Sequence, residues 1–194
     1  IMFAKDKYSV IKQAISNEKA KFAFDYLNLK AKAVRHLYSN ALIAETDFLG
    51  TFRDEQVPNT YSIYGDFLME TLLQDVLPIM NENTQLNLYP TYAYARVYEE
   101  GCILEKHKDR PSCEISTTLN LGGDLWPIYL ENTKVDLNQG DMLIYKGCEL
   151  EHWREKFTGK NCTQVFLHYN RVEKDNKKNL YDGRFMLGLP ASTR

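Results

Sequence analysis

A series of short, strand-like runs separated by turn signals fills the second half of the chain. The turns contain glycine, asparagine or aspartate, as at Gly122-Gly123 and at Asn138-Gln-Gly-Asp141. Many short strands with regular breaks are typical of an antiparallel double-sheet barrel. No βαβ alternation and no phosphate-loop glycine pattern is present, so the predicted fold class is mainly β with flanking helices, a double-stranded β-helix (jelly roll). The predicted strands cover residues 92–98, 102–106, 114–121, 126–130, 142–145 and 163–169.

The first half of the chain predicts one strand and two helices packed on the outside of the sheet. Residues 8–15 read as a strand, and Ser16 or Asn17 can cap a helix that runs to about Leu37. Residues 40–62 read as a loop, and the residues from Asp175 onward as a surface turn or tail. The apolar face expected to be buried in the first helix consists of Phe22, Tyr26, Leu29, Ala33 and Leu37.

The second helix is predicted from a regular apolar stripe. Pro78 should end or kink this helix, because proline lacks an amide hydrogen and clashes with the preceding turn. Both helices are expected to be structural. The stripe consists of Met69, Leu72, Leu73, Val76, Leu77 and Met80.

Length and composition predict one ordinary globular domain. The chain has 194 residues, of which 44% are hydrophobic and 26% charged. We expect a single domain over residues 1–194, in which 1–85 support a jelly-roll core at 86–172. The formal net charge of −2 argues against non-specific binding of nucleic acid. No apolar run approaches a membrane span, and the 4 scattered cysteines read as free thiols in a reducing, cytoplasmic setting.

One pair of residues carries the strongest chemical signal. His107 and Asp109 are two positions apart, so they share a face at the end of a strand. Residues 141–152 resemble a strand, a turn and a second strand that carries His152, which can return to the same end of the barrel. Two imidazoles and one carboxylate on one face of a metal are typical of non-haem Fe(II) oxygenases. His168 competes as third ligand but reads better as a core histidine, and the Cys113 thiol suits such a site poorly.

A 2-oxoacid could supply the extra electrons that such an iron centre needs. Its far carboxylate then requires a buried cation and a hydroxyl group. Lys160 follows His152 closely at the start of an apolar strand, and Tyr98 precedes the metal pair. A solvated turn lysine is the alternative interpretation of Lys160. Arg154 and Arg96 are alternative cations, and Arg96 shares a strand face with Tyr98.

These motifs resemble the 2-oxoglutarate/Fe(II)-dependent dioxygenases, within them the prolyl-4-hydroxylase-like branch. The resemblance covers about residues 90–170. Uncharacterised bacterial and phage members are also similar, through the Tyr-Pro-Thr-Tyr and Trp-Pro-Ile-Tyr segments at 89–92 and 126–129. The matches are Tyr98, His107-x-Asp109, the Gly-Asp141 approach to His152, and Gly-Lys160 leading into Val-Phe-Leu-His168.

The resemblance implies a set of roles. His107, Asp109 and His152 would bind Fe(II). Lys160 and Tyr98 would hold the C5 carboxylate of 2-oxoglutarate, in a pocket that Thr118 also lines. It also implies O₂ as cosubstrate and ascorbate as an accessory reductant. The short interval before His152 implies that substrate-covering insertions are absent there.

The expected activity is hydroxylation of a C–H bond in a peptidyl prolyl, another amino-acid substrate or a small molecule. A carboxylate at Asp109 favours hydroxylation over halogenation, which would need that position free for halide. Two other classes stay open. One is a non-catalytic, cupin-like jelly roll that holds a metal or a sugar, and the other is a structural protein with His107 and Asp109 on its surface.

Overall fold

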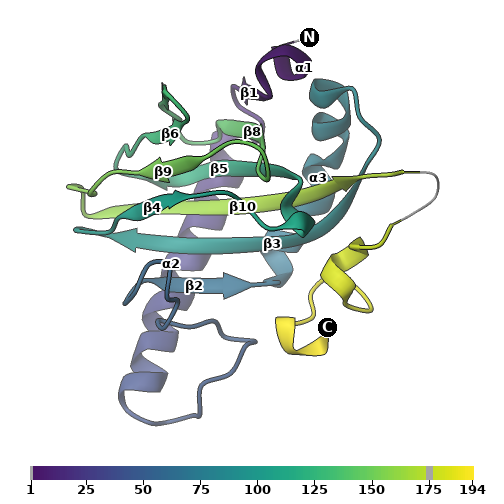
Figure 1. The fold of residues 1–194 in the computed structure, drawn as a ribbon. Coiled ribbons are helices and arrows are strands. Elements are labelled where there is room, and N and C mark those ends of the chain that lie inside the picture. Colours follow the sequence, from purple (N-terminus) through teal and green to yellow (C-terminus); the bar gives the residue numbers. More distant parts are fainter. Residues whose placement is uncertain (1, 174–176) are drawn as a thin grey trace.

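Two antiparallel sheets face each other at the centre of the molecule (Figure 1). A computed structural model of the chain describes residues 2–173 and 177–194. The larger sheet has the order β1-β8-β5-β10-β3-β2 and consists of Tyr8–Ile11 (β1), Met142–Lys146 (β8), Ile115–Gly123 (β5), Asn161–Arg171 (β10), Leu88–Glu99 (β3) and Tyr61–Tyr64 (β2). The smaller sheet has the order β4-β9-β6-β7 and consists of Leu104–His107 (β4), His152–Arg154 (β9), Ile128–Leu130 (β6) and Thr133–Val135 (β7). The predicted jelly roll is confirmed.

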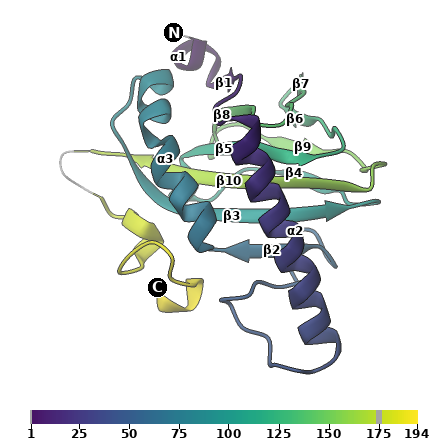
Figure 2. The same ribbon diagram turned by 180° about the vertical axis from the view of Figure 1, so that it is seen from behind.

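Helices cover the outer face of the larger sheet, as predicted. Figure 2 shows α2 (Asn17–Ser39) and α3 (Phe67–Thr84) lying across that face, with the smaller sheet on the far side. A short helix, α1 (Met2–Asp6), precedes β1. The Ser16 hydroxyl caps α2 by accepting from the Lys19 amide at 3.2 Å. None of the described helices combines the length and apolar character needed to cross a membrane.

The predicted buried face of α2 is wrong. Phe22 is 66% exposed and Leu29 is 71% exposed, although both belong to the apolar stripe expected to face the sheet. A second stripe of smaller residues faces the core instead. Small side chains let the helix axis approach the sheet closely, so packing and not the bulk of the apolar residues selects the face. The buried residues are Ala20, Ala23, Leu27, Ala31 and Val34.

The stripe predicted for α3 is confirmed, but the helix extends further than expected. Met69, Leu73 and Met80 are fully buried against the larger sheet. Asp66 caps the helix by accepting from the amides of Leu68 and Met69. The helix continues past Pro78 to Thr84, so the proline does not end it.

The strand predictions hold in the core of the sheets and fail at their edges. The runs in the second half of the chain all contain observed strands, whereas β2 and β7 were not predicted. The first strand is shorter than expected and ends at Ile11. Beyond it, Gln13 has a positive φ of 48° and its amide donates to the Asp141 carboxylate at 3.0 Å, so the chain turns away from the sheet.

The C-terminal segment is more than a surface tail. Residues 175 and 176, where this tail was predicted to begin, lie outside the described residues. Residues 177–194 contain two short 3-10 turns, η2 (Leu180–Gly183) and η3 (Ala191–Thr193). Arg184 is buried and pairs with Glu70 of α3 at 2.7 Å, which anchors the segment against the helix and β3.

Candidate metal centre and cosubstrate pocket

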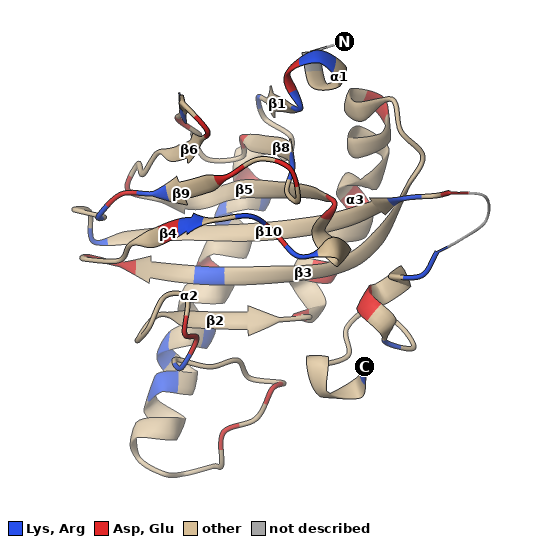
Figure 3. Cartoon of the chain, in the orientation of Figure 1, with Lys and Arg blue, Asp and Glu red and all other residues tan. Residues whose placement is uncertain are grey.

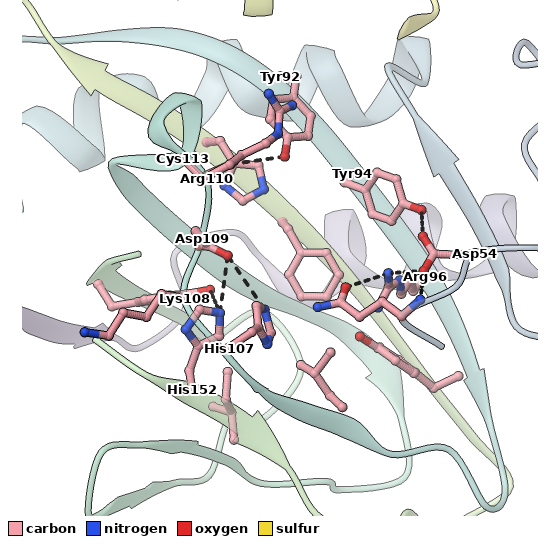
Figure 4. Close-up of a pocket in the computed structure, with 17 residues that line it drawn as sticks. Asp54, Tyr92, Tyr94, Arg96, His107, Lys108, Asp109, Arg110, Cys113 and His152 are labelled. Carbon is pink, nitrogen blue, oxygen red and sulfur yellow. Dashed lines mark hydrogen bonds and ion pairs between the residues drawn. The ribbon is translucent and has the colours of Figure 1, made fainter. Parts of the chain in front are cut away.

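A cavity of about 330 Å³ lies between the two sheets, where inward-facing side chains of both meet. Strand alternation explains its lining, because every second residue of β3 faces the smaller sheet. Tyr92, Tyr94, Arg96 and Tyr98 come from this face of β3. Figure 4 shows two polar groups in the cavity, one around Asp109 and the other around Arg96.

The three predicted metal ligands meet at one side of the cavity. His107 ends β4 and His152 begins β9, and the two residues are direct partners in the register of these strands. Asp109 follows in the loop after β4. Its Oδ1 lies 3.4 Å from Nε2 of His152 and 3.7 Å from Nε2 of His107. One ligand atom from each residue can be chosen so that all lie within 4.8 Å of one another.

Both imidazoles are oriented to present Nε2. Nδ1 of His107 lies 2.8 Å from the Glu105 carbonyl, and Nδ1 of His152 lies 3.0 Å from the Leu150 carbonyl. A carbonyl can only accept, so each Nδ1 carries a proton, and it is Nε2 that has the free lone pair when the ring is neutral. Burial, followed by the neighbouring His152, lowers the pKa of His107, so this ring is neutral near pH 7.

Asp109 supplies the negative charge of the site. Burial opposes its ionisation, but the neighbouring His152 and the Ser116 hydroxyl, which donates to Oδ2, lower its pKa to about 2. Two imidazoles and one carboxylate on one side of a cavity fit a divalent first-row metal and would leave its other coordination positions open.

Two further donors that lack partners in the described part of the chain lie between the sheets, Tyr98 in the cavity lining and Arg154 outside it. Arg154 follows His152 by two residues on β9, so it shares the inward face, and it is 1% exposed. Its guanidinium donates to the Trp126 carbonyl and, at 3.3 Å, to the Thr118 hydroxyl, while Nε has no partner among the described residues. The hydroxyl of Tyr98, 0% exposed, is likewise without a partner there.

Arg96 lies at the opposite end of the cavity from the metal ligands and is held by an outer loop. One terminal nitrogen donates to Asp54 and to Gln56, each at 2.8 Å, while Nε is unpartnered within the described chain. Tyr94 also donates to Asp54. Burial disfavours a charge on Tyr98, and Arg96 and Arg154 oppose that effect, yet the pKa of Tyr98 remains raised. The phenol is therefore a neutral donor between two buried cations.

The structure does not bring Lys160 to this cavity. Its side chain is exposed in the turn before β10, and its amide donates to Asp124 at 2.7 Å. The turn places it on the surface, which matches the alternative interpretation of a solvated lysine. Thr118, Arg154, Arg96 and Tyr98 are all buried.

The other residues weighed as ligands lie beside the centre but outside the ligand group. His168 is buried in the cavity wall, and its Nδ1 contacts Ser116. The thiol of Cys113 lies 3.1 Å from the Tyr92 hydroxyl. Sequence reasoning did not identify Ser116, although it lies two residues before Thr118 on β5. The alternation that places Thr118 inward would have placed Ser116 inward as well.

Comparisons with known proteins agree on the fold. No protein-family model matches the sequence, and no curated protein matches it significantly. Among solved structures, a Pseudomonas putida prolyl-4-hydroxylase is similar, with a TM-score of 0.60 and 14% identity over 88% of this chain and 95% of that one. HygX from Streptomyces hygroscopicus, with nickel, 2-oxoglutarate and hygromycin B bound, has a TM-score of 0.64 and 12% identity over 93% of this chain and 94% of that one.

A third neighbour carries out a different reaction. The non-haem α-ketoglutarate-dependent epimerase SnoN from nogalamycin biosynthesis has a TM-score of 0.63 and 10% identity over 88% of this chain and 80% of that one. At these identities the likeness establishes the fold. The chain shares its jelly-roll fold with these three proteins.

Proposed function

We propose that this protein is an Fe(II)- and 2-oxoglutarate-dependent oxygenase. The observation that carries the proposal is the close grouping of His107, Asp109 and His152. All three side chains line the cavity between the two sheets of a jelly roll. The unpartnered donors of Tyr98 and Arg154 support it, because sealed polar groups without partners are costly unless a ligand satisfies them.

The metal would be held by Nε2 of both histidines and by the Asp109 carboxylate. A bound Fe(II) ion would supply the activation of O₂, with 2-oxoglutarate as the source of two electrons. The chain's own contribution is orientation. The Glu105 and Leu150 carbonyls hold both imidazoles with Nε2 toward the metal position.

The C5 carboxylate of 2-oxoglutarate would be bound by Arg154, Tyr98 and Thr118. Arg154 lies on the same strand face as the metal ligand His152, and its free Nε together with the Tyr98 hydroxyl offers two donors to an anion. Arg96 is the second candidate cation, since its Nε is also unpartnered among the residues described. This assignment replaces Lys160 by arginine.

The proposed reaction is oxidation of a C–H bond, with hydroxylation of a peptidyl prolyl or another amino-acid substrate as the leading case. The prolyl-4-hydroxylase neighbour supports this substrate class, whereas SnoN shows that the fold also serves epimerisation. Acidic and basic residues are interspersed over the described part of the chain (Figure 3), which fits a peptide or small molecule better than nucleic acid.

Calorimetric titration of 2-oxoglutarate into the Mn(II)-loaded, oxygen-free protein tests the proposal. We expect one site per chain and, in air with Fe(II), release of succinate. His107→Ala and Asp109→Ala should each abolish succinate release. Metal binding without affinity for 2-oxoglutarate would favour a cupin-like binding protein, and full turnover in either variant would disprove the proposed site.

A further inference from the structure

The two oxygens of the Asp109 carboxylate have different neighbours. Oδ1 faces Nε2 of His107 and His152, whereas Oδ2 lies 2.6 Å from the hydroxyl of Ser116. Ser116 comes from the buried strand β5 and is 0% exposed. One oxygen is therefore turned to the ligand group, and the other is turned to the protein.

The single proton of Ser116 has three nearby partners. Its Oγ lies 2.6 Å from Oδ2 of Asp109, 3.0 Å from the Cys113 carbonyl and 3.0 Å from Nδ1 of His168. An ionised carboxylate can only accept, and hydrogen bonds to charged groups are the shortest and strongest. The hydroxyl proton therefore goes to Asp109, and the contact with His168 needs a proton on Nδ1.

His168 is positioned to donate this hydrogen bond from Nδ1. The ring is 6% exposed and packs against Tyr92 with a centroid distance of 4.6 Å. His168 and Ser116 are direct partners in the register of β10 and β5, so the sheet itself sets their contact. Burial lowers the pKa of His168 to about 4, so the ring is neutral and carries one N–H. That N–H occupies a lone pair of Ser116 and directs the hydroxyl proton toward Asp109.

We propose that Ser116 and His168 are positioning residues that restrict Asp109 to one metal-binding oxygen. The inference rests on the metal site of the proposed function. A donor on Oδ2 would keep that oxygen from binding the metal, so that Asp109 would occupy one coordination position only. Conversely, loss of the donor would free the carboxylate to rotate and to bind with both oxygens.

Co(II) binding tests this role without the unknown substrate. Ser116→Ala should lower the affinity for Co(II) about 10- to 100-fold, which is the usual effect of removing the hydrogen-bond partner of a metal ligand. It should also change the shape of the visible d–d spectrum of bound Co(II), whereas a smaller folded fraction would lower only its intensity. Ser62→Ala is the matched control, because Ser62 is a fully buried serine of the same sheet whose hydroxyl has no partner in the described chain.

Variants of His168 keep the proposal testable if Ser116→Ala does not fold. His168→Leu removes the hydrogen-bond donor to Ser116 and should lower the affinity for Co(II) by a similar factor. His168→Asn retains an N–H near the position of Nδ1 and should restore most of the affinity. Thermal unfolding of each variant reports folding separately.

The outcomes separate this inference from the proposed function. The positioning role is overturned if Ser116→Ala and His168→Leu bind Co(II) as tightly as Ser62→Ala, with the wild-type spectrum. If the wild-type protein binds Co(II) but has no affinity for 2-oxoglutarate, the proposed oxygenase function fails, and the variants still decide the positioning role.

Discussion

The backbone of Gly147 lies directly against the carboxylate of Asp109. The Asp109 amide donates to the Gly147 carbonyl at 2.9 Å. A β-carbon at position 147 would overlap Oδ2 of Asp109 and would lie 2.6 Å from both the Cys113 carbonyl and the Ser116 hydroxyl. Close approach of the chain, not a special backbone angle, therefore requires glycine at this position.

Gly147→Ala should damage the metal site more than the fold. The added methyl group must push Asp109 or Ser116 out of place, so we expect a loss in Co(II) affinity of at least about 10-fold. Isothermal titration with Co(II), combined with thermal unfolding, measures both effects. A variant with wild-type affinity for Co(II) would show that the carboxylate does not need its observed position.

Substitution of Arg154 should separate cosubstrate binding from metal binding. Arg154→Met removes a buried cation that touches none of the proposed metal ligands, so Co(II) affinity should stay within about 3-fold. Loss of a charged hydrogen-bond partner should weaken the binding of 2-oxoglutarate by about 1.5–3 kcal/mol, or roughly 10- to 150-fold. Calorimetric titration of 2-oxoglutarate into the Mn(II)-loaded protein measures this loss of affinity.

Lys160→Met is the matched control for that experiment. Lys160 is exposed on the surface in the turn before β10, so its substitution should leave both affinities unchanged. If Lys160→Met no longer binds 2-oxoglutarate while Arg154→Met binds it with wild-type affinity, Arg154 does not bind the C5 carboxylate.

Stability should fall in mildly acidic solution because of His168. Burial lowers its folded pKa to about 4, whereas an imidazole in the unfolded chain has a pKa of about 6.5. The unfolded state binds more protons between these values, so this contribution is complete above pH 6.5 and is lost as the pH falls toward 4. The loss is at most about 3 kcal/mol. Asp109, with a pKa of about 2, adds a separate loss only below about pH 4.

Urea unfolding of the metal-free protein at pH 4.5 and 7.5 measures this difference. His168→Asn should reduce the pH dependence, because the titrating ring is absent. His107, whose pKa burial also lowers, contributes in the same direction and remains in the variant. His36→Asn changes an exposed residue of α2 and should keep the wild-type profile. An unchanged profile in His168→Asn would contradict the prediction.

The buried pair of Glu70 and Arg184 should be essential for docking the C-terminal segment. The two side chains are 2% and 0% exposed and lie 2.7 Å apart. Arg184→Met leaves an uncompensated buried carboxylate and should cost about 3–5 kcal/mol of unfolding free energy. Denaturant unfolding measures the loss, and the double variant Glu70→Gln/Arg184→Met should recover part of it. A loss below about 1 kcal/mol would show that the segment contributes little.

The pair His107 and Asp109 could be proposed from the sequence because its signal is local and depends on strand alternation. His107 and Asp109 are two positions apart, and the preference of a divalent metal for imidazole and carboxylate does not depend on the fold. The short strands and the stripe of α3 were predictable for the same reason, since each pattern repeats within one element. Arg154 was also within reach, since it shares a strand face with His152.

Interactions between distant elements could not be predicted in this way. Two apolar stripes run along α2, and the choice between them depends on how closely the helix packs on β5 and β10. The choice between Lys160 and Arg154 as the buried cation depends on where the turn before β10 leaves the sheet. Ser116 and His168 meet only because β5 pairs with β10.

The sequence by itself determined the class of fold and the candidate metal ligands His107, Asp109 and His152, which the structure brings together. Only the tertiary structure decided which cation is buried beside Tyr98, which face of α2 packs inward, and which groups hold Asp109. The physical reason is distance along the chain. Periodicity and ligand chemistry act within a few residues, whereas burial and hydrogen bonding depend on pairing between segments far apart in sequence.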